Sequence, residues 1–303
     1  MPLRTVSLSF AVGALVLSGL TGCNGADPQA PPGTPAANAG IKSGQETSAA
    51  STPEPPAVVD IRAVELGTME WSYSPRGLDQ PVTVKLVDGA ASAGTGAGLV
   101  SYTLEEVAYG DVDGDGDEDA VARINRSNDM AFEGLWYVWR ADGADVVQLK
   151  YPIAQTGRCG TYVESVVISD GAVALTEYLR IPGLDDKIPC SDPGTGLQKR
   201  TVTVHAEGPD AWPVQTAPVP AWGGLCPGPR WPDSAPGLVD LWTAPSRGAA
   251  VATSKAPDGG AFFELKDAPL TQREGWSLIG FRLFGVDTDA GGADLACAWG
   301  AAA

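Results

Sequence analysis

Residues 162–179 read YVESVVISDGAVALTEYL, which is two runs of strand-forming residues on either side of Asp170-Gly171. An Asp-Gly dipeptide between two such runs is the strongest short-range signal for a β-hairpin. We therefore predict strands over 162–169 and 172–179. This hairpin decides the fold class, because similar patterns recur through the middle of the chain.

Three further stretches extend the pattern. Residues 82–86 alternate apolar and polar side chains before Asp88-Gly89, and residues 135–140 and 146–150 flank an ADGAD turn sequence. Residues 201–206 alternate valine with threonine, while no window of 11 or more residues keeps a helical stripe. Glycine and proline supply 38 and 25 of the 303 residues, which suits short strands and turns. The sequence predicts a mainly β, antiparallel domain.

The amino-acid composition argues against two kinds of function, nucleic-acid binding and zinc binding by paired histidines. Lys and Arg number 20 against 37 Asp and Glu, which gives a net charge of −17. Such a chain repels phosphate backbones, so nucleic acid is disfavoured as a partner. His205 is the single histidine, so a zinc site built on paired histidines has no ligands.

The N-terminus has the features of a secretion signal. A positive start at Arg4 precedes an apolar stretch over residues 6–20, which is too short for a membrane-spanning helix. The stretch ends on Leu20-Thr21-Gly22-Cys23, which resembles the lipobox of bacterial lipoproteins. The resemblance implies that residues 1–22 are removed and that Cys23 is lipidated. The expected location is the extracytoplasmic face of the cell membrane, and the alternative is an ordinary secretory signal.

The segment after Cys23 differs from the rest of the chain. Between residues 24 and 57 there are seven prolines, no aromatic residue, and Ile41 as the one large aliphatic residue. We expect residues 23–57 to form a lipid anchor followed by a disordered tether. A second proline-rich stretch follows Gly208, and we place a domain boundary near Pro218. The predicted domains are residues 58–217, with β structure and the loop described next, and residues 218–303, smaller and also rich in β structure.

The sharpest chemical motif is DVDGDGDED at residues 111–119, where acidic residues occupy six of nine positions. Calcium takes six to eight oxygen ligands, so alternate carboxylates must converge while the chain turns sharply at Gly116. The side chains of Asp111, Asp113 and Asp115 are the expected ligands. Asp117 would contribute its main chain, and Asp119 would bind directly or through water. The alternative is a solvated acidic turn without metal.

The residues after this loop exclude an EF-hand. Position twelve is Ala122 instead of glutamate, and residues 120–124 have the pattern of a strand. The loop resembles the Asp-x-Asp-x-Asp-Gly-x-x-Asp loops of FG-GAP and VCBS repeats, where calcium ties one strand to the next. With Tyr109-Gly110-Asp111 and residues 139–143, the chain is similar to actinobacterial surface lipoproteins that carry one such loop. A single copy does not support a propeller.

Four cysteines remain outside the signal region, and an extracytoplasmic location favours disulfides. Three pairings are possible. We expect Cys159 to pair with Cys190 and Cys226 with Cys297, because crossed pairs would have to bridge the two predicted domains. Zinc is the alternative, but the sequence holds no Cys-x-x-Cys spacing.

The C-terminal part is less informative. Residues 241–251 and 275–280, with a Gly-Trp pair in the second stretch, resemble a bacterial SH3-like barrel. The resemblance implies a small barrel that binds cell-wall peptide or another partner. Trp136, Trp139, Trp242 and Trp276 could stack on sugars, but core packing is expected because strand surfaces favour half-buried aromatics.

Two functional classes follow. The first is a calcium-stabilised, lipid-tethered module with a binding or structural role at the cell envelope. The second is an extracytoplasmic hydrolase with paired carboxylates, for which the candidates are Glu105, Glu106, Glu164 and Glu177. No Gly-x-Ser-x-Gly elbow is present, and His205 lies in an alternating strand pattern. We expect the non-enzymatic role.

Overall fold

The structure is a computed structural model that describes residues 58–181, 183–226, 240–253, 263–264, 269–282 and 295–301. The predicted signal peptide over residues 1–22, the lipidation site Cys23 and the tether over residues 23–57 lie outside the described residues. Within those ranges the helices are all short 3-10 turns, and none has the length and apolar character needed to cross a membrane. They are η1 (Ile61–Ala63), η2 (Leu66–Thr68), η3 (Pro75–Gly77), η4 (Gly96–Gly98) and η5 (Pro269–Thr271).

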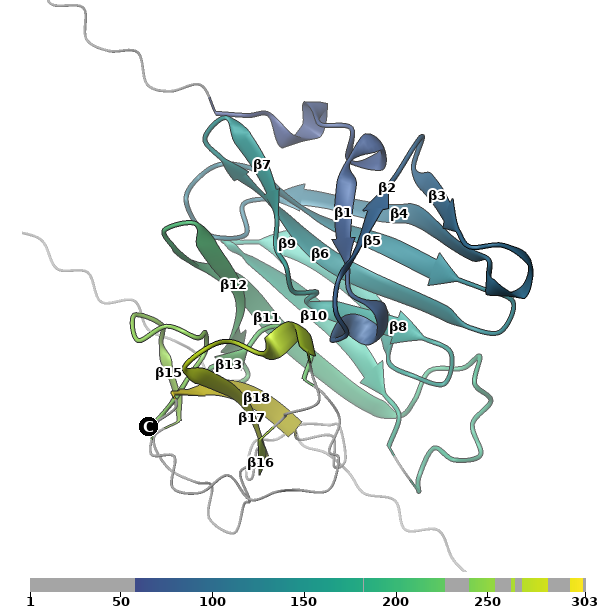
Figure 1. Ribbon diagram of the computed structural model, residues 1–303. Helices are drawn as coiled ribbons and strands as arrows, with labels where there is room; N and C mark the ends of the chain where they lie inside the picture. The colour runs from purple at the N-terminus through teal and green to yellow at the C-terminus, as the bar shows by residue number, and fades with distance from the viewer. Residues whose placement is uncertain are drawn as a thin grey trace, which may run out of the picture. The chain divides into compact units, whose positions relative to one another are not determined.

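The described strands form antiparallel sheets, so the predicted fold class is confirmed (Figure 1). The N-terminal hairpin pairs β1 (Glu70–Tyr73) with β2 (Val82–Lys85). The central sheet has the order β3-β4-β5-β6-β7, and β8 also pairs with β6. Its strands are β3 (Ala90–Ala93), β4 (Val100–Gly110), β5 (Asp119–Ser127), β6 (Phe132–Asp142), β7 (Asp145–Gln148) and β8 (Ala154–Gly157).

Two more sheets complete the described part of the chain. The second sheet has the order β13-β12-β11-β10-β9, and the C-terminal sheet has the order β15-β14-β18-β17-β16. The strands of the second sheet are β9 (Tyr162–Ser169), β10 (Ala172–Leu179), β11 (Gly196–Glu207), β12 (Asp210–Ala217) and β13 (Ala221–Trp222). Those of the C-terminal sheet are β14 (Leu241–Trp242), β15 (Val251–Thr253), β16 (Phe263–Glu264), β17 (Trp276–Arg282) and β18 (Leu295–Ala301).

The predicted hairpins are present in the structure. Strands β9 and β10 coincide with the predicted ranges, and the turn between them places Asp170 and Gly171 at φ values of 52° and 73°. Two consecutive residues with positive φ are what a two-residue type I′ hairpin turn requires. Strands β6 and β7 form the second predicted hairpin. The local turn chemistry therefore sets these pairings.

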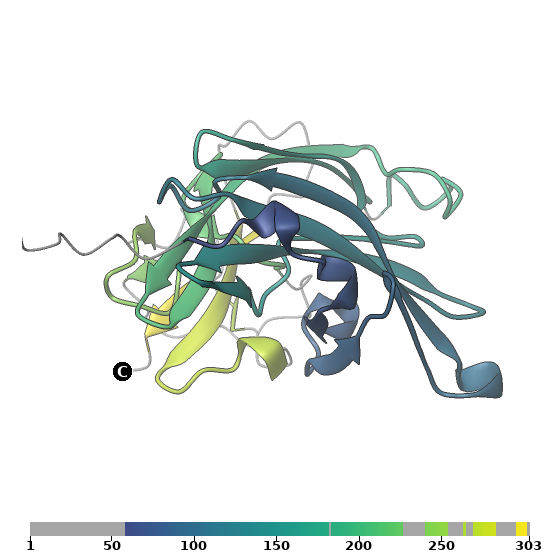
Figure 2. The same ribbon diagram turned by 90° about the horizontal axis from the view of Figure 1, so that it is seen from above.

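The central strands β5 and β6 of this sheet are largely buried, with a core on each face of the sheet (Figures 1 and 2). In β6, Leu135, Tyr137 and Trp139 pack with the N-terminal hairpin, and the alternate residues Trp136 and Val138 pack with the second sheet. Neighbouring residues of a strand face opposite sides of the sheet, so burial of both faces produces a continuous apolar run. The core-packing interpretation of Trp136 and Trp139 holds, because 3% and 2% of their surfaces are exposed.

Residues on both sides of the predicted boundary at Pro218 share structure. Strand β13 pairs with β12, and a further apolar core joins Trp212 and Trp222 of the second sheet to Leu278 and Trp299 of the C-terminal sheet. The described residues, from 58 to 301, belong to one compact unit. A boundary between separately folding domains stays a prediction.

Both expected disulfides are formed. Cys159 is bonded to Cys190 and Cys226 to Cys297. The second bond links the segment that follows β13 to β18, so it fastens the C-terminal sheet to the second sheet beside their shared core.

Candidate metal centre

The acidic loop, residues 111–118, connects β4 to β5 at one end of the central sheet. Gly110 and Asp119 are paired across the two strands and close the loop. The loop is therefore an enlarged hairpin connection, held between the end of β4 and the start of the largely buried β5.

The loop folds around its own carboxylates. Asp111 accepts hydrogen bonds from the backbone N–H of Gly114 at 2.6 Å and of Gly116 at 3.1 Å. Asp113 and Asp115 each accept one from the N–H two residues further on, at 3.3 and 2.9 Å. Gly114 and Gly116 adopt φ values of 81° and 97°, which residues with a Cβ rarely tolerate. The aspartates and glycines together fix the turn.

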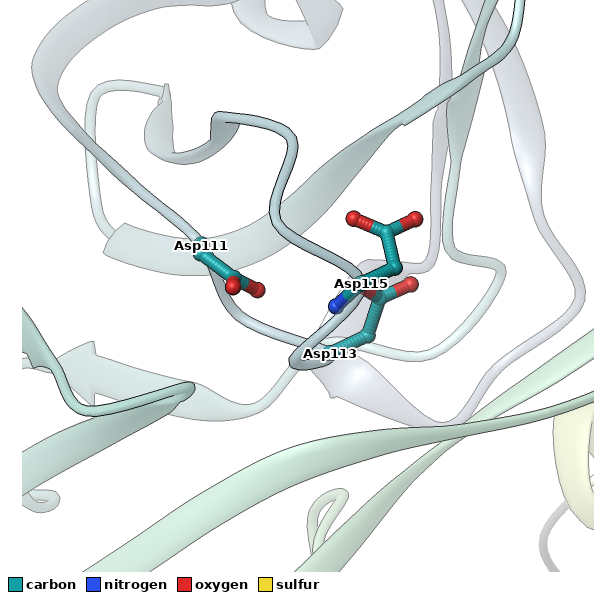
Figure 3. Close-up of side chains that lie close together, drawn as sticks. All are labelled: Asp111, Asp113 and Asp115. Carbon is teal, nitrogen blue, oxygen red and sulfur yellow. The ribbon is translucent and has the colours of Figure 1, made fainter. Parts of the chain in front are cut away.

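This turn brings the side chains of Asp111, Asp113 and Asp115 together, as the sequence predicts (Figure 3). One carboxylate oxygen from each lies within 4.8 Å of the others. An ion that binds oxygens at about 2.3–2.6 Å can touch two oxygens this far apart, so the spacing fits calcium. A set of oxygen ligands alone favours a hard cation over soft metals.

Asp117 and Asp119 are not part of this group of three. Asp117 donates its backbone N–H to Asp115. The Asp119 side chain is fully buried, and its two oxygens accept the N–H groups of Val112 and Ala141, each at 2.9 Å. Burial raises the pKa of Asp119 to about 6, and these two N–H groups partly offset the effect. Asp119 thus ties the loop to β6 in this structure.

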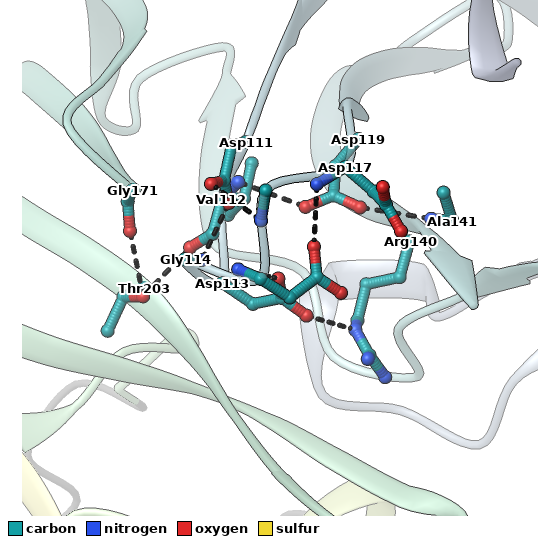
Figure 4. A network of polar contacts seen from close by, with 12 residues as sticks. Asp111, Val112, Asp113, Gly114, Asp117, Asp119, Arg140, Ala141, Gly171 and Thr203 are labelled. Atoms are coloured by element: carbon teal, nitrogen blue, oxygen red, sulfur yellow. Dashed lines mark hydrogen bonds and ion pairs between the residues drawn. The ribbon is translucent and has the colours of Figure 1, made fainter. Parts of the chain in front are cut away.

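Arg140 of β6 is a member of the site that the sequence did not reveal. Its Nε lies 2.7 Å from Oδ2 of Asp113, and 11% and 7% of the two side chains are exposed (Figure 4). Outside this pair, Arg62 binds Glu118 with both side chains about half exposed. An arginine within the apolar run of β6 was the signal available in the sequence.

The remaining charge of the loop is negative. Among the described residues, no ion pair joins Asp111, Asp115 or Asp117 to a cationic side chain. Burial raises the pKa of Asp115, and the neighbouring carboxylates of Asp113 and Asp117 raise it further, against a lowering by the N–H of Asp117. The loop therefore destabilises its own ionised form, and a bound cation would relieve this repulsion.

The acidic loop also docks on the second sheet. Val112 is fully buried, and its carbonyl accepts a hydrogen bond from Oγ1 of Thr203 at 2.8 Å. The same hydroxyl lies 3.0 Å from the carbonyl of Gly171, in the β9–β10 turn (Figure 4). A Cβ on Gly171 would lie 3.4 Å from the Cα of Gly114, so turn and loop are in close contact. One loop thus contacts both sheets.

The carboxylates considered for hydrolysis have other roles or are exposed. Glu177 is the buried member of the four, and Arg200 binds both of its oxygens at 2.7 and 3.1 Å. Glu105 and Glu106 lie exposed on β4, and Glu164 is exposed on β9. The hydrolase alternative stays a prediction.

His205 stacks on Trp212, with ring centroids 6.0 Å apart, so it belongs to the packing between β11 and β12. The acidic loop is therefore the cluster in the described residues whose chemistry points to a ligand, and that ligand is a hard cation. Comparisons of the chain with protein-family models, with curated proteins and with solved structures found no match.

Proposed function

We propose that this chain is an extracytoplasmic lipoprotein, anchored to the cell membrane through Cys23, with a calcium-stabilised β fold and a binding or structural role at the cell envelope. The observation that carries the calcium part is the convergence of Asp111, Asp113 and Asp115 within 4.8 Å. The anchor rests on the sequence of residues 1–23.

The acidic loop contacts both the central and the second sheet, so a calcium ion bound there would stabilise the fold. Asp119 links the loop to Ala141 of β6, and Val112 links it to Thr203 of β11. A cation that fixes the loop would therefore hold the central and second sheets together. A ligand that binds only the native state at one hundred times its Kd stabilises that state by about 2.7 kcal/mol.

Thermal unfolding with calcium, magnesium or chelator tests the metal. We expect millimolar calcium to raise the Tm and magnesium to raise it less, because magnesium sheds its water reluctantly and demands octahedral geometry. Asp113→Asn combined with Asp115→Asn should remove the calcium effect. Asp142→Asn with Asp145→Asn is the matched control, since it removes two exposed acids from the β6–β7 turn. A wild-type Tm that is the same in all three solutions would leave only an acidic turn.

Metabolic labelling with palmitate tests the anchor. Wild-type chain produced in a bacterium should carry the label and remain in the membrane fraction, whereas Cys23→Ala should lose the label and keep its signal peptide. The lipid chains contribute roughly 0.8 kcal/mol per buried CH₂, so two or three of them hold a protein stably. Wild-type protein found in the medium with an unmodified N-terminus would show an ordinary secretory signal instead.

A further inference from the structure

A hollow of about 460 Å³ opens on the second sheet, beside the acidic loop. Its lining includes Ala172, Ala174, Thr201 and Thr203. Their neighbours in sequence, such as Val173 and Val202, point into the core shared with the central sheet. Adjacent residues of a strand face opposite sides, so the hollow lies on the face turned away from the central sheet.

The C-terminal sheet covers the same face a short distance away. Thr203 is paired directly with Val214 of β12, and Val214 is buried in the core shared with the C-terminal sheet. Directly paired residues lie on the same face, so the hollow adjoins the line where the two sheets meet. Small-molecule sites occur preferentially at such junctions, and volumes of roughly 300–1,000 Å³ are usual for them.

The polar groups at the hollow are hydroxyls and one carboxylate. The polar residues of its lining are Ser169, Asp170, Thr201, Thr203 and Thr216, and the lining holds no lysine or arginine. In the part of the chain that the structure describes, the hydroxyls of Ser169 and Thr201 and the carboxylate of Asp170 have no protein partner for a hydrogen bond or ion pair. Three groups are thus available to a ligand.

We propose that this hollow binds a saccharide unit that is neutral or carries an amine, which gives the proposed binding role a location. Ligand hydroxyls would exchange hydrogen bonds with Ser169 and Thr201, and an amine would pair with Asp170. Anionic sugars are rejected, because the one charge at the hollow is negative and the chain carries a net charge of −17.

The hollow shares part of its wall with the contacts of the acidic loop. Gly171 and Thr203 line the hollow, and they are also the residues against which Gly114 and Val112 rest. Order in the acidic loop therefore supports the shape of the hollow. Sugar binding should be stronger in calcium than in chelator if the loop holds the ion.

The experiment is a titration of the mature chain, carrying Cys23→Ser to prevent lipidation, followed by amide NMR shifts. The probes are glucosamine, glucose and glucose 6-phosphate. We expect glucosamine and glucose to shift the amides of Ser169, Gly171 and Thr201, with glucosamine about fivefold tighter because its bond to a carboxylate is charge-assisted. Glucose 6-phosphate should leave these amides unchanged.

Two variants locate the binding. Thr201→Val keeps the shape of the side chain without its hydroxyl and should weaken glucose binding about fivefold. Asp170→Asn tolerates the positive φ of this turn and should abolish the preference for glucosamine. The control is Thr83→Val, at an exposed position of β2, which should leave the binding of both sugars unchanged.

The proposal is overturned if none of the three sugars shifts these amides in the folded chain, or if the preference for glucosamine survives Asp170→Asn. The sugar titration reads the hollow, whereas the calcium melting curves read the acidic loop. Failure of one is therefore distinguishable from failure of the other.

Discussion

Two regions of this molecule differ in how the negative charge of their carboxylates is balanced. In the second sheet, Glu177 and Arg200 form a buried pair in which both carboxylate oxygens face the guanidinium at 2.7 and 3.1 Å. In the acidic loop and Asp119, which follows it, six of nine residues are acids, and Arg140 and Arg62 each bind one of them. The first region is neutral by itself, whereas the second keeps a negative excess.

The surroundings of the two regions follow from this difference. Arg200 also donates to the carbonyl of Ile153 at 2.8 Å, so the pair is buried with its hydrogen bonds met inside the protein. Asp115 and the glycines of the acidic loop are exposed, so water and ions can reach the excess charge. A balanced pair can be buried as a structural element, while an unbalanced cluster near the surface depends on the solution for its counter-charge.

Arg200→Met breaks the balanced region and should have the largest effect. It leaves the carboxylate of Glu177 buried without a partner, and removal of one member of a buried pair costs about 3–5 kcal/mol. Urea unfolding of the mature chain measures this loss in the free energy of unfolding.

Arg76→Met is the matched control for that experiment. Arg76 pairs with Asp79, but 82% and 39% of the two side chains are exposed. Exposed pairs contribute about 0–1 kcal/mol, so this variant should stay near wild type. Equal losses in the two variants would show that burial does not distinguish these pairs.

Much of the fold could be predicted from local sequence. The Asp170-Gly171 turn fixes one hairpin because both residues must adopt positive φ, and the alternation in residues 201–205 matches the buried and half-buried faces of β11. The spacing of Asp111, Asp113 and Asp115 likewise predicted their convergence, since a short turn with two glycines brings alternate residues together.

The contacts that complete the candidate site depend on long-range packing. Thr203 is 91 residues from Val112, and Arg140 is 27 residues from Asp113, so no local pattern couples them. The spacing predicts Asp119 as a ligand, directly or through water, whereas in the structure its two oxygens accept backbone N–H groups. Burial of both faces of the central sheet brings these groups together.

Arg140→Met tests whether Arg140 and calcium offset the same negative charge in the acidic loop. Without calcium it removes the cation beside Asp113, and a lost charged hydrogen bond in a largely buried pair should cost about 2 kcal/mol. With saturating calcium the loss should fall to about half, because the ion offsets the same negative charge.

The control is Arg62→Met, which removes an exposed arginine that pairs with Glu118 of the same loop. Its effect should be small in both solutions. If the loss in Arg140→Met is as large in calcium as in chelator, the ion and Arg140 do not act on the same charge.

Asp185→Asn should have the smallest effect on the free energy of unfolding. Asp185 extends the comparison to a carboxylate that is held by N–H groups and a hydroxyl instead of by arginine. It accepts hydrogen bonds from the N–H of Ile181 at 2.8 Å and of Thr195 at 2.9 Å, and from Oγ1 of Thr195 at 2.7 Å. These two backbone N–H groups are the main cause that lowers the pKa of Asp185 below its ordinary value. An aspartate in an unfolded chain titrates near pH 3.9, so the contribution of Asp185 to the free energy of unfolding begins to change at about that pH.

A lowered folded-state pKa means that the ionised carboxylate stabilises the native state above the unfolded pKa and that this contribution is lost as the pH falls through the folded pKa. The difference in free energy of unfolding between wild type and Asp185→Asn should therefore be constant from pH 7 to about pH 5 and shrink below about pH 4. Urea unfolding at several pH values measures it, with exposed Asp145→Asn as the control. A difference that stays constant down to pH 3 would mean that the N–H groups around Asp185 do not favour its charged form. Arginine side chains would then be the only protein groups shown to stabilise a carboxylate here, and the comparison between the two regions would depend on them alone.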